Sequence, residues 1–464
     1  MSHYEIPREE CGIVGVYGHP EAAKMVYLGL YALQHRGQES AGIVASDGEK
    51  LRIYKNKGLV SEVFNPRSRL DELTGNMAIG HVRYSTTGSN RIANAQPLLV
   101  NYRGGSLAIA HNGNLINAAE LRHELENRGA IFQGTADSEI IVHLIAQAAS
   151  DDFLQGLATS LYRIRGAWSL LFLREKQMVA VKDPRGIRPL CIGTLDGATV
   201  VASESCALDI MGAQHLRALK PGEMIIVDEG GVRHEFPFPP VDERFCVFEY
   251  IYYSRPDSVC HGKSVYQIRH ALGERLAIEQ PAPADLVIPT PDSSNAAAIG
   301  YAHQAGLPFH LGLIRSHYIG RTFIEPDQGI RNFGAKLKYS PVASLLEGKS
   351  VVVVDDSIVR GTTSIKIINM LRRAGARQVH LRISAPPWKH PCFYGIDTPT
   401  EKELIANQLD HEAMTKHFGC DSLGFISLEG LLQVVPRTQT YCTACFNGDY
   451  PAGKPNHFTK NIME

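Results

Sequence analysis

The sequence has almost no net charge, few cysteines and no long apolar segment, and each shortage excludes a class of protein. Its 47 lysines and arginines nearly cancel its 48 aspartates and glutamates, which leaves a formal net charge of −1. A chain so balanced has no overall attraction for nucleic acid or for an anionic membrane surface. No segment approaches the roughly 20 apolar residues that a membrane-spanning helix needs. We therefore expect no nucleic-acid partner and no membrane partner.

The nine cysteines are too sparse for a disulfide scaffold, and their number is odd. Residues 1–10 contain three glutamates and no apolar run, which is not the pattern of a secretory signal. The 464 residues, 44% hydrophobic and 20% charged, have an ordinary globular composition and predict two or three domains. Together these features predict a cytoplasmic protein whose cysteines serve as free thiols, nucleophiles or metal ligands.

The first half of the chain combines short apolar strands with three helical segments. Most of the strands end at Gly, Asn-Gly or Asp-Pro, and the helical segments have apolar residues three and four positions apart. This mixture favours layered α+β packing. The predicted strands are residues 11–17, 41–45, 51–54, 77–84, 107–111, 168–173, 178–182 and 224–227, and the predicted helices are residues 21–34, 118–128 and 138–149.

A proline-rich break at residues 236–240 is the best candidate for a domain boundary. Beyond it, strands and helices alternate. Continuous valine and isoleucine runs indicate strands buried on both faces of a parallel, doubly wound sheet. The predicted strands are residues 285–290, 309–315, 350–355 and 378–385, and the predicted helices are residues 295–304 and 364–374.

The segment from Val351 to Ser364 is the most informative in the chain. Four valines form its strand, so Asp355 and Asp356 emerge at the carboxyl end, where parallel sheets bind ligands. The following Arg360-Gly-Thr-Thr-Ser364 offers backbone N–H groups, three hydroxyls and a helix N-terminus, which suit a phosphate monoester. The aspartates are placed to hold ribose hydroxyls directly or through Mg²⁺. The alternative, two solvated loop charges beside a capped helix, is disfavoured by their position next to this glycine loop.

This motif resembles the signature of the type I phosphoribosyltransferases, which bind phosphoribosyl pyrophosphate (PRPP). By this resemblance the loop at residues 289–294 is the pyrophosphate loop, often with a non-proline cis peptide, and the basic segment at 321–338 is a mobile lid that excludes water. The alternative for each is an ordinary solvated loop. The resemblance assigns PRPP binding to Asp292, Ser293, Arg321, Asp355, Asp356, Arg360, Gly361, Thr362, Thr363 and Ser364, and one Mg²⁺ per subunit to Ser293, Asp355 and Asp356.

Cys11 opens the first predicted strand, and three polar motifs accompany it. Residues 33–39 (Leu-Gln-His-Arg-Gly-Gln-Glu), 81–88 (His-Val-Arg-Tyr-Ser-Thr-Thr-Gly) and 111–115 (His-Asn-Gly-Asn-Leu) each put polar groups at the end of a strand or helix. Singly, such residues are more often a surface arginine, a helix N-cap or a hairpin turn. Together with Asp137-Ser-Glu139, over about residues 11–235, they resemble the glutaminase domain of the N-terminal-nucleophile amidotransferases.

This resemblance implies an αββα sandwich that hydrolyses glutamine. The base is the α-amino group of the nucleophile itself, which titrates near ~7.7–8 when free. Residues 1–10 must then be removed as a propeptide, because the same nitrogen inside a chain is a non-basic amide. The resemblance assigns the nucleophile to Cys11, the oxyanion hole to Asn112 and Gly113, the α-carboxylate clamp to Arg83, the α-ammonium clamp to Asp137, and the loop that shapes the pocket to Arg36 and Gly37.

Cys442 and Cys445 form a pair with two residues between them. Such a pair serves as a redox dithiol, as half of a zinc site or as part of an iron–sulfur cluster, and spacing alone ranks zinc and iron–sulfur equally. Cys246 and Cys392 stand alone in the same half of the chain. Their contexts and the pair resemble the four-cysteine site of the iron–sulfur subgroup of the glutamine PRPP amidotransferases, which implies one [4Fe–4S] cluster per subunit.

The resemblance to the glutamine PRPP amidotransferases extends over nearly the whole chain. It implies a glutaminase domain at residues 11–235 and an α/β phosphoribosyltransferase domain with a parallel sheet at residues 236–464, whose C-terminal tail holds the cluster. The implied reaction passes ammonia from glutamine to C1 of PRPP and gives 5-phosphoribosylamine, pyrophosphate and glutamate, the entry step of purine synthesis. The family is typically a homotetramer inhibited by purine nucleotides.

Two other functions remain open. The same glutaminase serves another ammonia acceptor in the sugar-phosphate aminotransferase and in asparagine synthetase, and the motif at residues 351–364 disfavours both. A PRPP-sensing regulator would keep the transferase fold for binding alone. The neutral charge and the full set of glutaminase motifs disfavour that function.

Overall fold

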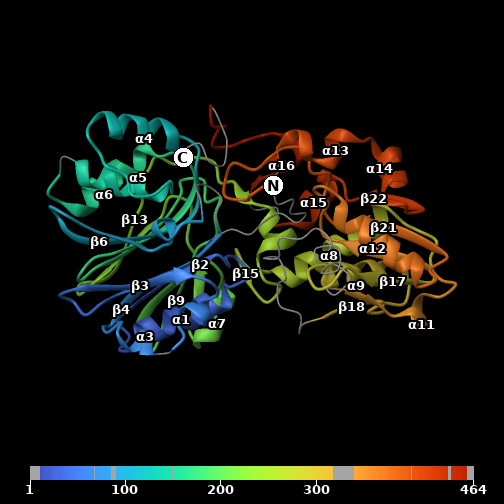
Figure 1. Ribbon diagram of the computed structural model, residues 1–464, viewed down its shortest axis with the longest axis horizontal. Coiled ribbons are helices and arrows are strands. Elements are labelled where there is room, and N and C mark those ends of the chain that lie inside the picture. Colours follow the sequence, from blue (N-terminus) through green and yellow to red (C-terminus); the bar gives the residue numbers. More distant parts are fainter. Residues whose placement is uncertain are drawn as a thin grey trace.

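The computed structural model describes residues 11–66, 68–84, 90–148, 150–316, 339–398, 400–436 and 440–456. They form two lobes side by side, the first lobe from the first half of the chain and the second lobe from the second half (Figure 1). The propeptide expected at residues 1–10 and the lid expected at 321–338, with Arg321, lie outside the described residues. Within the described ranges, no helix is both long and apolar enough to cross a membrane.

The first lobe is built on two antiparallel sheets. A seven-stranded sheet has the order β11-β9-β10-β1-β4-β2-β3, and a six-stranded sheet has the order β13-β12-β8-β7-β6-β5. Apolar side chains of both sheets, such as Ile13, Ile79 and Leu171, are fully buried in one shared core. The strands are β1 (Gly12–Tyr17), β2 (Ser40–Ser46), β3 (Leu51–Lys57), β4 (Met77–Arg83), β5 (Leu98–Tyr102), β6 (Gly105–Leu115), β7 (Gly166–Leu173), β8 (Met178–Lys182), β9 (Cys191–Leu195), β10 (Ala198–Ala202), β11 (Gln214–Ala218), β12 (Met224–Asp228) and β13 (Gly231–Glu235).

Helices cover the outer face of each sheet and complete an αββα sandwich, which confirms the fold expected for this lobe (Figure 1). The seven-stranded sheet carries α1 (Ala22–Ala32), α2 (Val60–Val63), α3 (Ser68–Asp71) and α7 (Ser205–Met211), and the six-stranded sheet carries α4 (Ala118–Asn127), α5 (Ser138–Gln147) and α6 (Phe153–Arg163). The sequence analysis did not predict α6, although its buried Phe153, Leu157 and Leu161 recur every fourth residue.

The second lobe contains a four-stranded parallel sheet of order β17-β20-β21-β22, as expected for the transferase half. β20 is an inner strand, and all of its residues are buried, in line with its run of valines. α9 packs against β17 and β20, α12 against β21, and α14 against β22. The elements are α8 (Val265–Glu279), β17 (Leu286–Pro289), α9 (Asn295–Ala305), α11 (Ala343–Leu346), β20 (Ser350–Asp355), α12 (Thr362–Arg373), β21 (Gln378–Ile383), α13 (Ile405–Gln408), α14 (His411–Phe418), β22 (Ser422–Phe425), α15 (Leu428–Val434) and α16 (Ala444–Asn447).

One predicted strand of the second lobe is wrong. Residues 309–315 do not form a strand of the parallel sheet, which Phe309 touches only through an isolated bridge to Val287. Instead, β18 (Leu313–Arg315) pairs antiparallel with β19 (Tyr339–Pro341) in a separate ribbon. The sheet is completed by β22, which is too short to stand out as an apolar run.

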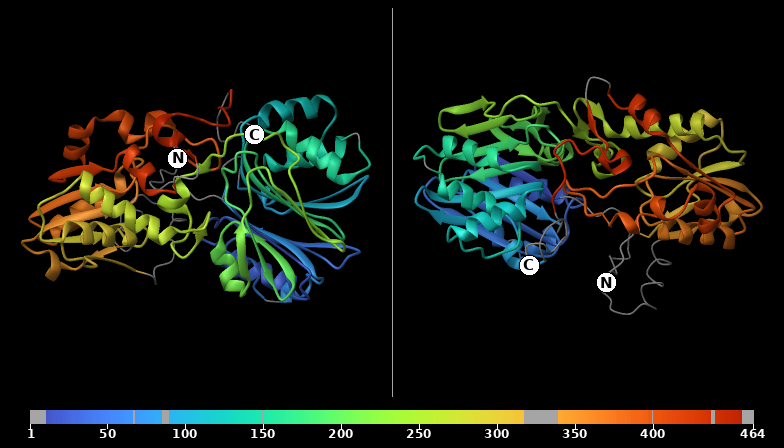
Figure 2. Two further views of the ribbon diagram at one scale, coloured as in Figure 1. Left: turned by 180° about the vertical axis from the view of Figure 1, so that it is seen from behind. Right: turned by 90° about the horizontal axis from the view of Figure 1, so that it is seen from above.

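The C-terminal segment ties the lobes together. β14 (Phe245–Cys246) pairs in parallel with β23 (Tyr441–Cys442), near the π-helical turn η2 (Glu249–Tyr253) and the ribbon of β15 (Val259–Cys260) and β16 (Lys263–Ser264). The chain then returns to the first lobe, where Asn456 donates a hydrogen bond to Glu120 of α4 (Figure 2). The last described residues therefore bridge both halves of the molecule.

α8 and α9 touch backbone to backbone. A Cβ atom on Gly273 would lie 1.8 Å from the carbonyl oxygen of Ala297, and one on Gly300 would lie 1.9 Å from the carbonyl oxygen of His270. Only glycine fits at either position. Because α9 begins directly after the loop at residues 290–294, this contact also fixes the direction in which the chain leaves that loop.

Candidate active sites

A pocket in the first lobe lies where the ends of three strands meet the start of a helix. Cys11 precedes β1, Arg83 ends β4, Gly113 lies in β6, and Asp137 precedes α5. The structure thus brings four of the predicted glutamine-site residues to one pocket. Its full lining is Cys11, Arg83, Tyr84, Gln96, His111, Gly113, Ala136 and Asp137.

Cys11 is buried at the wall of this pocket. Its Sγ donates to the carbonyl oxygen of Tyr84 at 3.5 Å. Burial raises the pKa of the thiol to about 11, although the Tyr84 contact and the charge of Arg83 act in the opposite direction. At neutral pH the thiol is therefore protonated, and it needs a base to become a nucleophile.

Arg83 and Asp137 give the pocket one positive and one negative charge. Arg83 is only 3% exposed and lies 3.9 Å from Glu39. Asp137 does not cap α5, because its Oδ2 instead accepts a hydrogen bond from the N–H of Leu115 at 2.9 Å. Burial opposes ionisation of Asp137, but His111, the Leu115 N–H and Arg83 hold its pKa below the ordinary value. Two opposite buried charges suit the two ends of an amino acid.

Asn112 and Gly113 lie within β6 and not in a hairpin turn. Asn112 is fully buried, its Nδ2 donates to Ser203 Oγ at 3.4 Å, and its Oδ1 has no hydrogen-bond partner among the described residues. Gly113 has a φ of +144°, and a Cβ there would lie 2.0 Å from the carbonyl oxygen of Ala167 on β7. The position therefore requires glycine. Gly113 lines the pocket, whereas Asn112, the residue before it, is not among the lining residues.

Arg36 and Gly37 follow α1 and take different places. A Cβ on Gly37 would lie 2.6 Å from the carbonyl carbon of Val82, so the loop rests on the backbone of β4 next to Arg83. Neither residue is among those that line the pocket, and Arg36 is fully buried in ion pairs with Glu204 and Glu249. These partners lie 168 and 213 residues further along the chain, out of reach of a motif.

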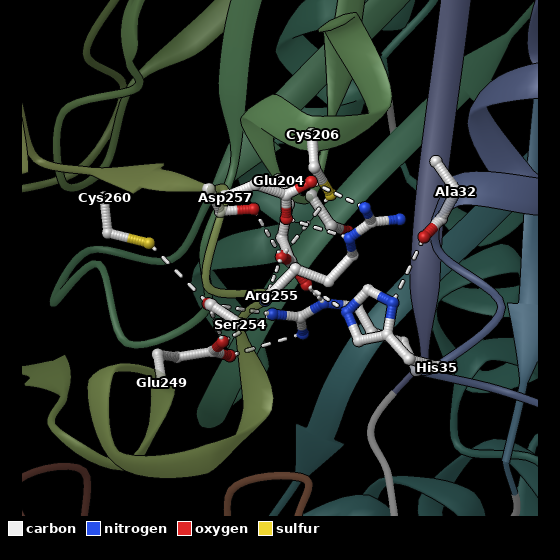
Figure 3. A network of polar contacts seen from close by, with 12 residues as sticks. Ala32, His35, Glu204, Cys206, Glu249, Ser254, Arg255, Asp257 and Cys260 are labelled. Carbon is white, nitrogen blue, oxygen red and sulfur yellow. Dashed lines mark hydrogen bonds and ion pairs between the residues drawn. The ribbon is translucent and has the colours of Figure 1, made fainter. Parts of the chain in front are cut away.

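A buried polar network that contains Glu204, Glu249 and Ser254 lies between the two lobes (Figure 3), and Arg36 bridges its two glutamates. Its guanidinium joins Glu204 of the first lobe to Glu249 of the second. Glu204 also accepts from the N–H of Arg255 at 2.8 Å and from the Oγ of Ser258 at 2.7 Å. Burial opposes ionisation of Glu204, yet the charge of Arg36 holds its pKa well below the ordinary value. The network joins the lobes through charged groups on both sides.

At the carboxyl end of β20, two buried carboxylates meet the loop that follows β17. The Oγ of Ser293 donates to Asp356 at 2.5 Å, and the Oγ of Ser294 donates to Asp355 at 3.3 Å. Burial raises the pKa of Asp356, which the hydroxyl of Ser293 and the charge of Arg269 only partly offset. The structure thus brings Ser293, Asp355 and Asp356 together, as the proposed Mg²⁺ ligand set requires.

The same loop contains a cis peptide bond between Pro291 and Asp292. The carboxylate of Asp292 accepts a hydrogen bond from Arg315 at 2.7 Å, and the hydroxyl of Tyr339 donates to the carbonyl oxygen of Pro291 at 3.1 Å. The antiparallel ribbon of β18 and β19, which carries Arg315 and Tyr339, therefore packs against the loop.

α12 begins inside the hydroxyl-rich segment, two residues earlier than the predicted start at Ser364. Gly361 stands at its N-cap with a φ of +81°. Thr362, Thr363 and Ser364 then form the first turn, and the buried Oγ1 of Thr362 has no hydrogen-bond partner among the described residues. Arg360 donates to Glu403 at 2.9 Å. A helix N-terminus with hydroxyls is suited to a phosphate group.

Four cysteines from three segments meet beside the junction of the lobes. The pairing of β14 with β23 puts Cys246 and Cys442 in register, and the N–H of Lys389 donates to the carbonyl oxygen of Cys445 at 2.9 Å. Burial raises the pKa of Cys445 well above the ordinary value, and the nearby Cys246, Cys442 and Cys392 raise it further. No three of the four sulfurs form a group whose ligand atoms all lie within 4.8 Å of one another.

The first lobe supplies a positive charge to these cysteines. Arg188, fully buried, lies 3.7 Å from Glu249, and its charge favours the thiolate forms of Cys246 and Cys392. Burial outweighs this charge and raises the pKa of both thiols. An anionic group bound by the four thiolates would therefore meet a cation that is already in place.

The segment that holds Cys392 also packs on β6. The Nδ2 of Asn114 donates to the carbonyl oxygen of Phe393 at 3.0 Å. Gly395 has a φ of +119°, and a Cβ there would lie 3.3 Å from the Cα of Gly113. The cysteine segment and the end of the pocket strand are thus in direct contact.

Four wall residues of the pocket have no binding role among the sequence-based assignments: Tyr84, Gln96, His111 and Ala136. Gln96 accepts from the N–H of His111 at 2.8 Å and donates to Ser138 Oγ at 2.9 Å, so it joins β6 to α5. The available signal was the presence of polar residues beside apolar strand runs. That signal does not say which polar residues share a pocket.

Comparison with known proteins identifies relatives over almost the entire chain. A family model for the glutamine amidotransferase domain matches residues 81–209. The chain is 52% identical to amidophosphoribosyltransferase 1, chloroplastic, of Arabidopsis thaliana, over 96% of this chain and 79% of that protein. It is 49% identical to the amidophosphoribosyltransferase of Bacillus subtilis, over 96% of this chain and 94% of that protein.

Two solved structures share the whole fold. One, of the allosteric regulatory enzyme of purine biosynthesis, matches with a TM-score of 0.94 at 48% identity and covers 98% of this chain and 99% of that chain. The other, glutamine PRPP amidotransferase from B. subtilis complexed with ADP and GMP, matches with a TM-score of 0.93 at 47% identity and covers 98% and 100%. Sequence and fold agree from the glutaminase sandwich to the C-terminal cysteines, and the chain belongs to the amidophosphoribosyltransferase family.

Proposed function

We propose that this protein transfers ammonia from glutamine to C1 of PRPP, which gives 5-phosphoribosylamine, pyrophosphate and glutamate, the first step of purine synthesis. The observation that carries the proposal is the presence of two different sites in one member of this family. One is a pocket with Cys11 between opposite charges, and the other is a pair of buried carboxylates beside a hydroxyl-rich helix start. A binding-only regulator has no use for the first site, and an enzyme with another ammonia acceptor has no use for the second.

In the glutaminase half, the thiol of Cys11 attacks the side-chain amide carbon of glutamine. The α-amine of the same residue accepts the thiol proton and passes it to the leaving ammonia. Asn112 and the N–H of Gly113 stabilise the oxyanion, while Arg83 and Asp137 hold the two ends of the amino acid. Water then hydrolyses the Cys11 thioester to glutamate, which restores the thiol.

In the transferase half, the protein positions PRPP for attack by ammonia at C1 as pyrophosphate leaves. Residues 361–364 bind the 5-phosphate, and Asp355 with Asp356 holds the ribose. Asp292 and Ser293 face the pyrophosphate, and Arg321 and Arg360 add positive charge. Two buried carboxylates with a serine hydroxyl 2.5 Å from one of them fit one Mg²⁺, held by Ser293, Asp355 and Asp356. The ion supplies charge neutralisation for the pyrophosphate.

We further assign Cys246, Cys392, Cys442 and Cys445 to one [4Fe–4S] cluster per chain. A single tetrahedral zinc with Zn–S bonds of ~2.3 Å would hold its sulfurs about 3.8 Å apart. No three of the four sulfurs lie within 4.8 Å of one another, and this observation with the buried charge of Arg188 favours a larger, anionic group. The four thiolates would hold the cluster, which supplies binding energy that ties the C-terminal tail to the fold.

Four finer assignments accompany this function. We place the domain boundaries after residues 10 and 235, and the span between β13 and β14 supports the second of them. Purine nucleotides are the expected feedback inhibitors, supported by the B. subtilis neighbour complexed with ADP and GMP. The protein is expected to be a homotetramer. It is also expected to be cytoplasmic.

Removal of residues 1–10 should be required for glutamine turnover. In the unprocessed chain the nitrogen of Cys11 is an amide, and burial raises the pKa of the thiol to about 11. The rate at which this thiol is alkylated should therefore rise about tenfold per pH unit from pH 7 to 10, because only the thiolate reacts. Intact-mass measurement identifies the N-terminus, and glutamate release measures activity. Turnover by a chain that begins at Met1 would show that the α-amine is not the base.

The two half-reactions should be separable by mutation. Cys11→Ala should lower glutamine-dependent synthesis by about 10³-fold or more and leave ammonia-dependent synthesis intact. Asp355→Asn combined with Asp356→Asn should abolish both, because PRPP no longer binds productively. Pyrophosphate release with glutamine or with ammonia measures each reaction. Equal loss of both reactions in a folded Cys11→Ala protein would falsify the division of roles.

Protein purified without oxygen should be brown, with about four irons and four sulfides per chain. Cys445→Ser should lower the iron content and the melting temperature, whereas Cys420→Ser, outside the cluster, should change neither. Metal analysis, sulfide analysis and thermal unfolding measure these effects. Stoichiometric zinc without sulfide in the anaerobic protein would exclude the iron–sulfur assignment.

A further inference from the structure

α8 and α9 carry three metal-ligating side chains outside both candidate active sites. His270 and Glu274 lie four residues apart on α8, and His303 lies on α9. The Nδ1 atoms of His303 and His270 lie 3.1 Å and 3.6 Å from Oε1 of Glu274. One ligand atom from each residue lies within 4.8 Å of the other two. Three protein ligands therefore already stand at metal-binding separation.

The close contact of the two helices holds this arrangement. Gly300 touches the carbonyl oxygen of His270 itself, and Gly273 precedes Glu274, so both ligands of α8 are fixed against α9. The side chain of His303 is 75% exposed, while those of His270 and Glu274 are partly buried. An ion there would be reached from solvent and would keep water as a further ligand.

We propose that His270, Glu274 and His303 bind one borderline divalent cation, of which Zn²⁺ is the best match. Two imidazole nitrogens with one carboxylate are zinc ligands, whereas Mg²⁺ and Ca²⁺ prefer oxygen donors. The bound ion clamps α9 to α8 and so restrains the helix that follows Asp292 and Ser293. The competing interpretation is a plain pair of ionic contacts, with protonated histidines and no metal.

Zinc titration of the cluster-loaded, full-length protein in excess Mg²⁺ tests this site. The wild type should bind one more zinc per chain than His303→Ala, and zinc should raise the melting temperature of the wild type but not that of His303→Ala. His417→Ala removes another exposed histidine of the second lobe and should behave as the wild type. Circular dichroism checks that each variant is folded. Equal zinc stoichiometry and affinity in the wild type and in His303→Ala overturns the proposal.

A second inference rests on the proposed function and concerns residues 392–395. This segment begins at a cluster cysteine and ends against the glycine assigned to the oxyanion hole. Gly113 is confined on one side by the carbonyl oxygen of Ala167 and on the other by Gly395. Asn114, the next residue of β6, is tied to the carbonyl oxygen of Phe393. The pocket strand is thus held from both lobes.

We infer that residues 392–395 position β6, the strand that carries Asn112 and Gly113, and that Asn114 is a positioning residue for glutamine hydrolysis. An oxyanion donor acts only when its N–H points at the developing charge, and a displacement of about 1 Å costs on the order of 10² in rate. Because Cys392 anchors one end of the segment, cluster loading and the geometry at Gly113 are linked through four residues.

Asn114→Ala, with Asn117→Ala as its control, tests the inference. Both asparagines are buried, but Asn117 donates to the carbonyl oxygen of Arg163 within the first lobe. Asn114→Ala should lower kcat for glutamine about tenfold to a hundredfold. KM for glutamine should stay within about twofold, because the clamp at Arg83 and Asp137 is untouched. Ammonia-dependent synthesis should not change. An unchanged kcat, or an equal loss in Asn117→Ala, overturns the inference.

Hydrogen exchange supplies a readout that does not depend on activity. Amides of β6 at residues 112–115 should exchange faster in cluster-free protein than in cluster-loaded protein, whereas amides of β2, remote from the segment, should not. Identical protection of β6 in the two forms would contradict the link. If the wild type lacks glutaminase activity, the proposed function is wrong. The exchange comparison then still tests the link between the cluster and β6 by itself.

Discussion

The junction of the two lobes depends on one guanidinium, that of Arg36, held between Glu204 and Glu249. All three side chains are completely buried, so none of the charges is solvated by bulk water. A charge in that position is tolerated only when its partners are present, and removal of one partner from such a group typically costs about 3–5 kcal/mol. Because one carboxylate comes from each lobe, the arginine is satisfied only when the lobes are docked. The domain interface is therefore specified by charge pairing as well as by apolar contact.

Two series of contacts start from Arg36, and each of them ends at one of the two candidate sites. On one side Gly37 rests on the backbone beside Arg83, which forms the pocket wall. On the other side the Oγ of Ser254 donates to Glu249 at 2.6 Å, and the carbonyl oxygen of Ser254 accepts from Arg269 at 2.7 Å. The charge of Arg269 in turn acts on Asp356. Packing, hydrogen bonds and charge thus connect the pocket beside Cys11 to Asp356 through the interior of the molecule.

What the sequence predicts well is local. The valines of β20 predict a strand buried on both faces, and the aspartates at its end lie where a parallel sheet binds its ligand. What it cannot predict is pairing at long range. The resemblance assigns Arg36 to the loop that shapes the pocket, and only the fold brings its two acidic partners to it. Residues 309–315 are predicted as a strand of the sheet, but β18 pairs with β19 instead. Apolar periodicity indicates that a strand is buried, and it does not identify the strand with which it pairs. Cysteine spacing likewise ranks zinc and iron–sulfur equally, because it does not report how the three cysteine segments are arranged in space.

The buried network also limits how this protein can move. Interfaces between domains of one chain are commonly polar and permit relative motion. Here, opening the junction would separate Glu204 from Glu249, so at least one of them would lose its ion pair with Arg36. It would also break the hydrogen bond from Asn114 to the carbonyl oxygen of Phe393. A hinge motion at this interface therefore costs free energy because it breaks buried ion pairs, whereas displacement of a loop on one lobe leaves these ion pairs intact. Movement that opens either candidate site is therefore less costly in loops confined to one lobe than at the junction between the lobes.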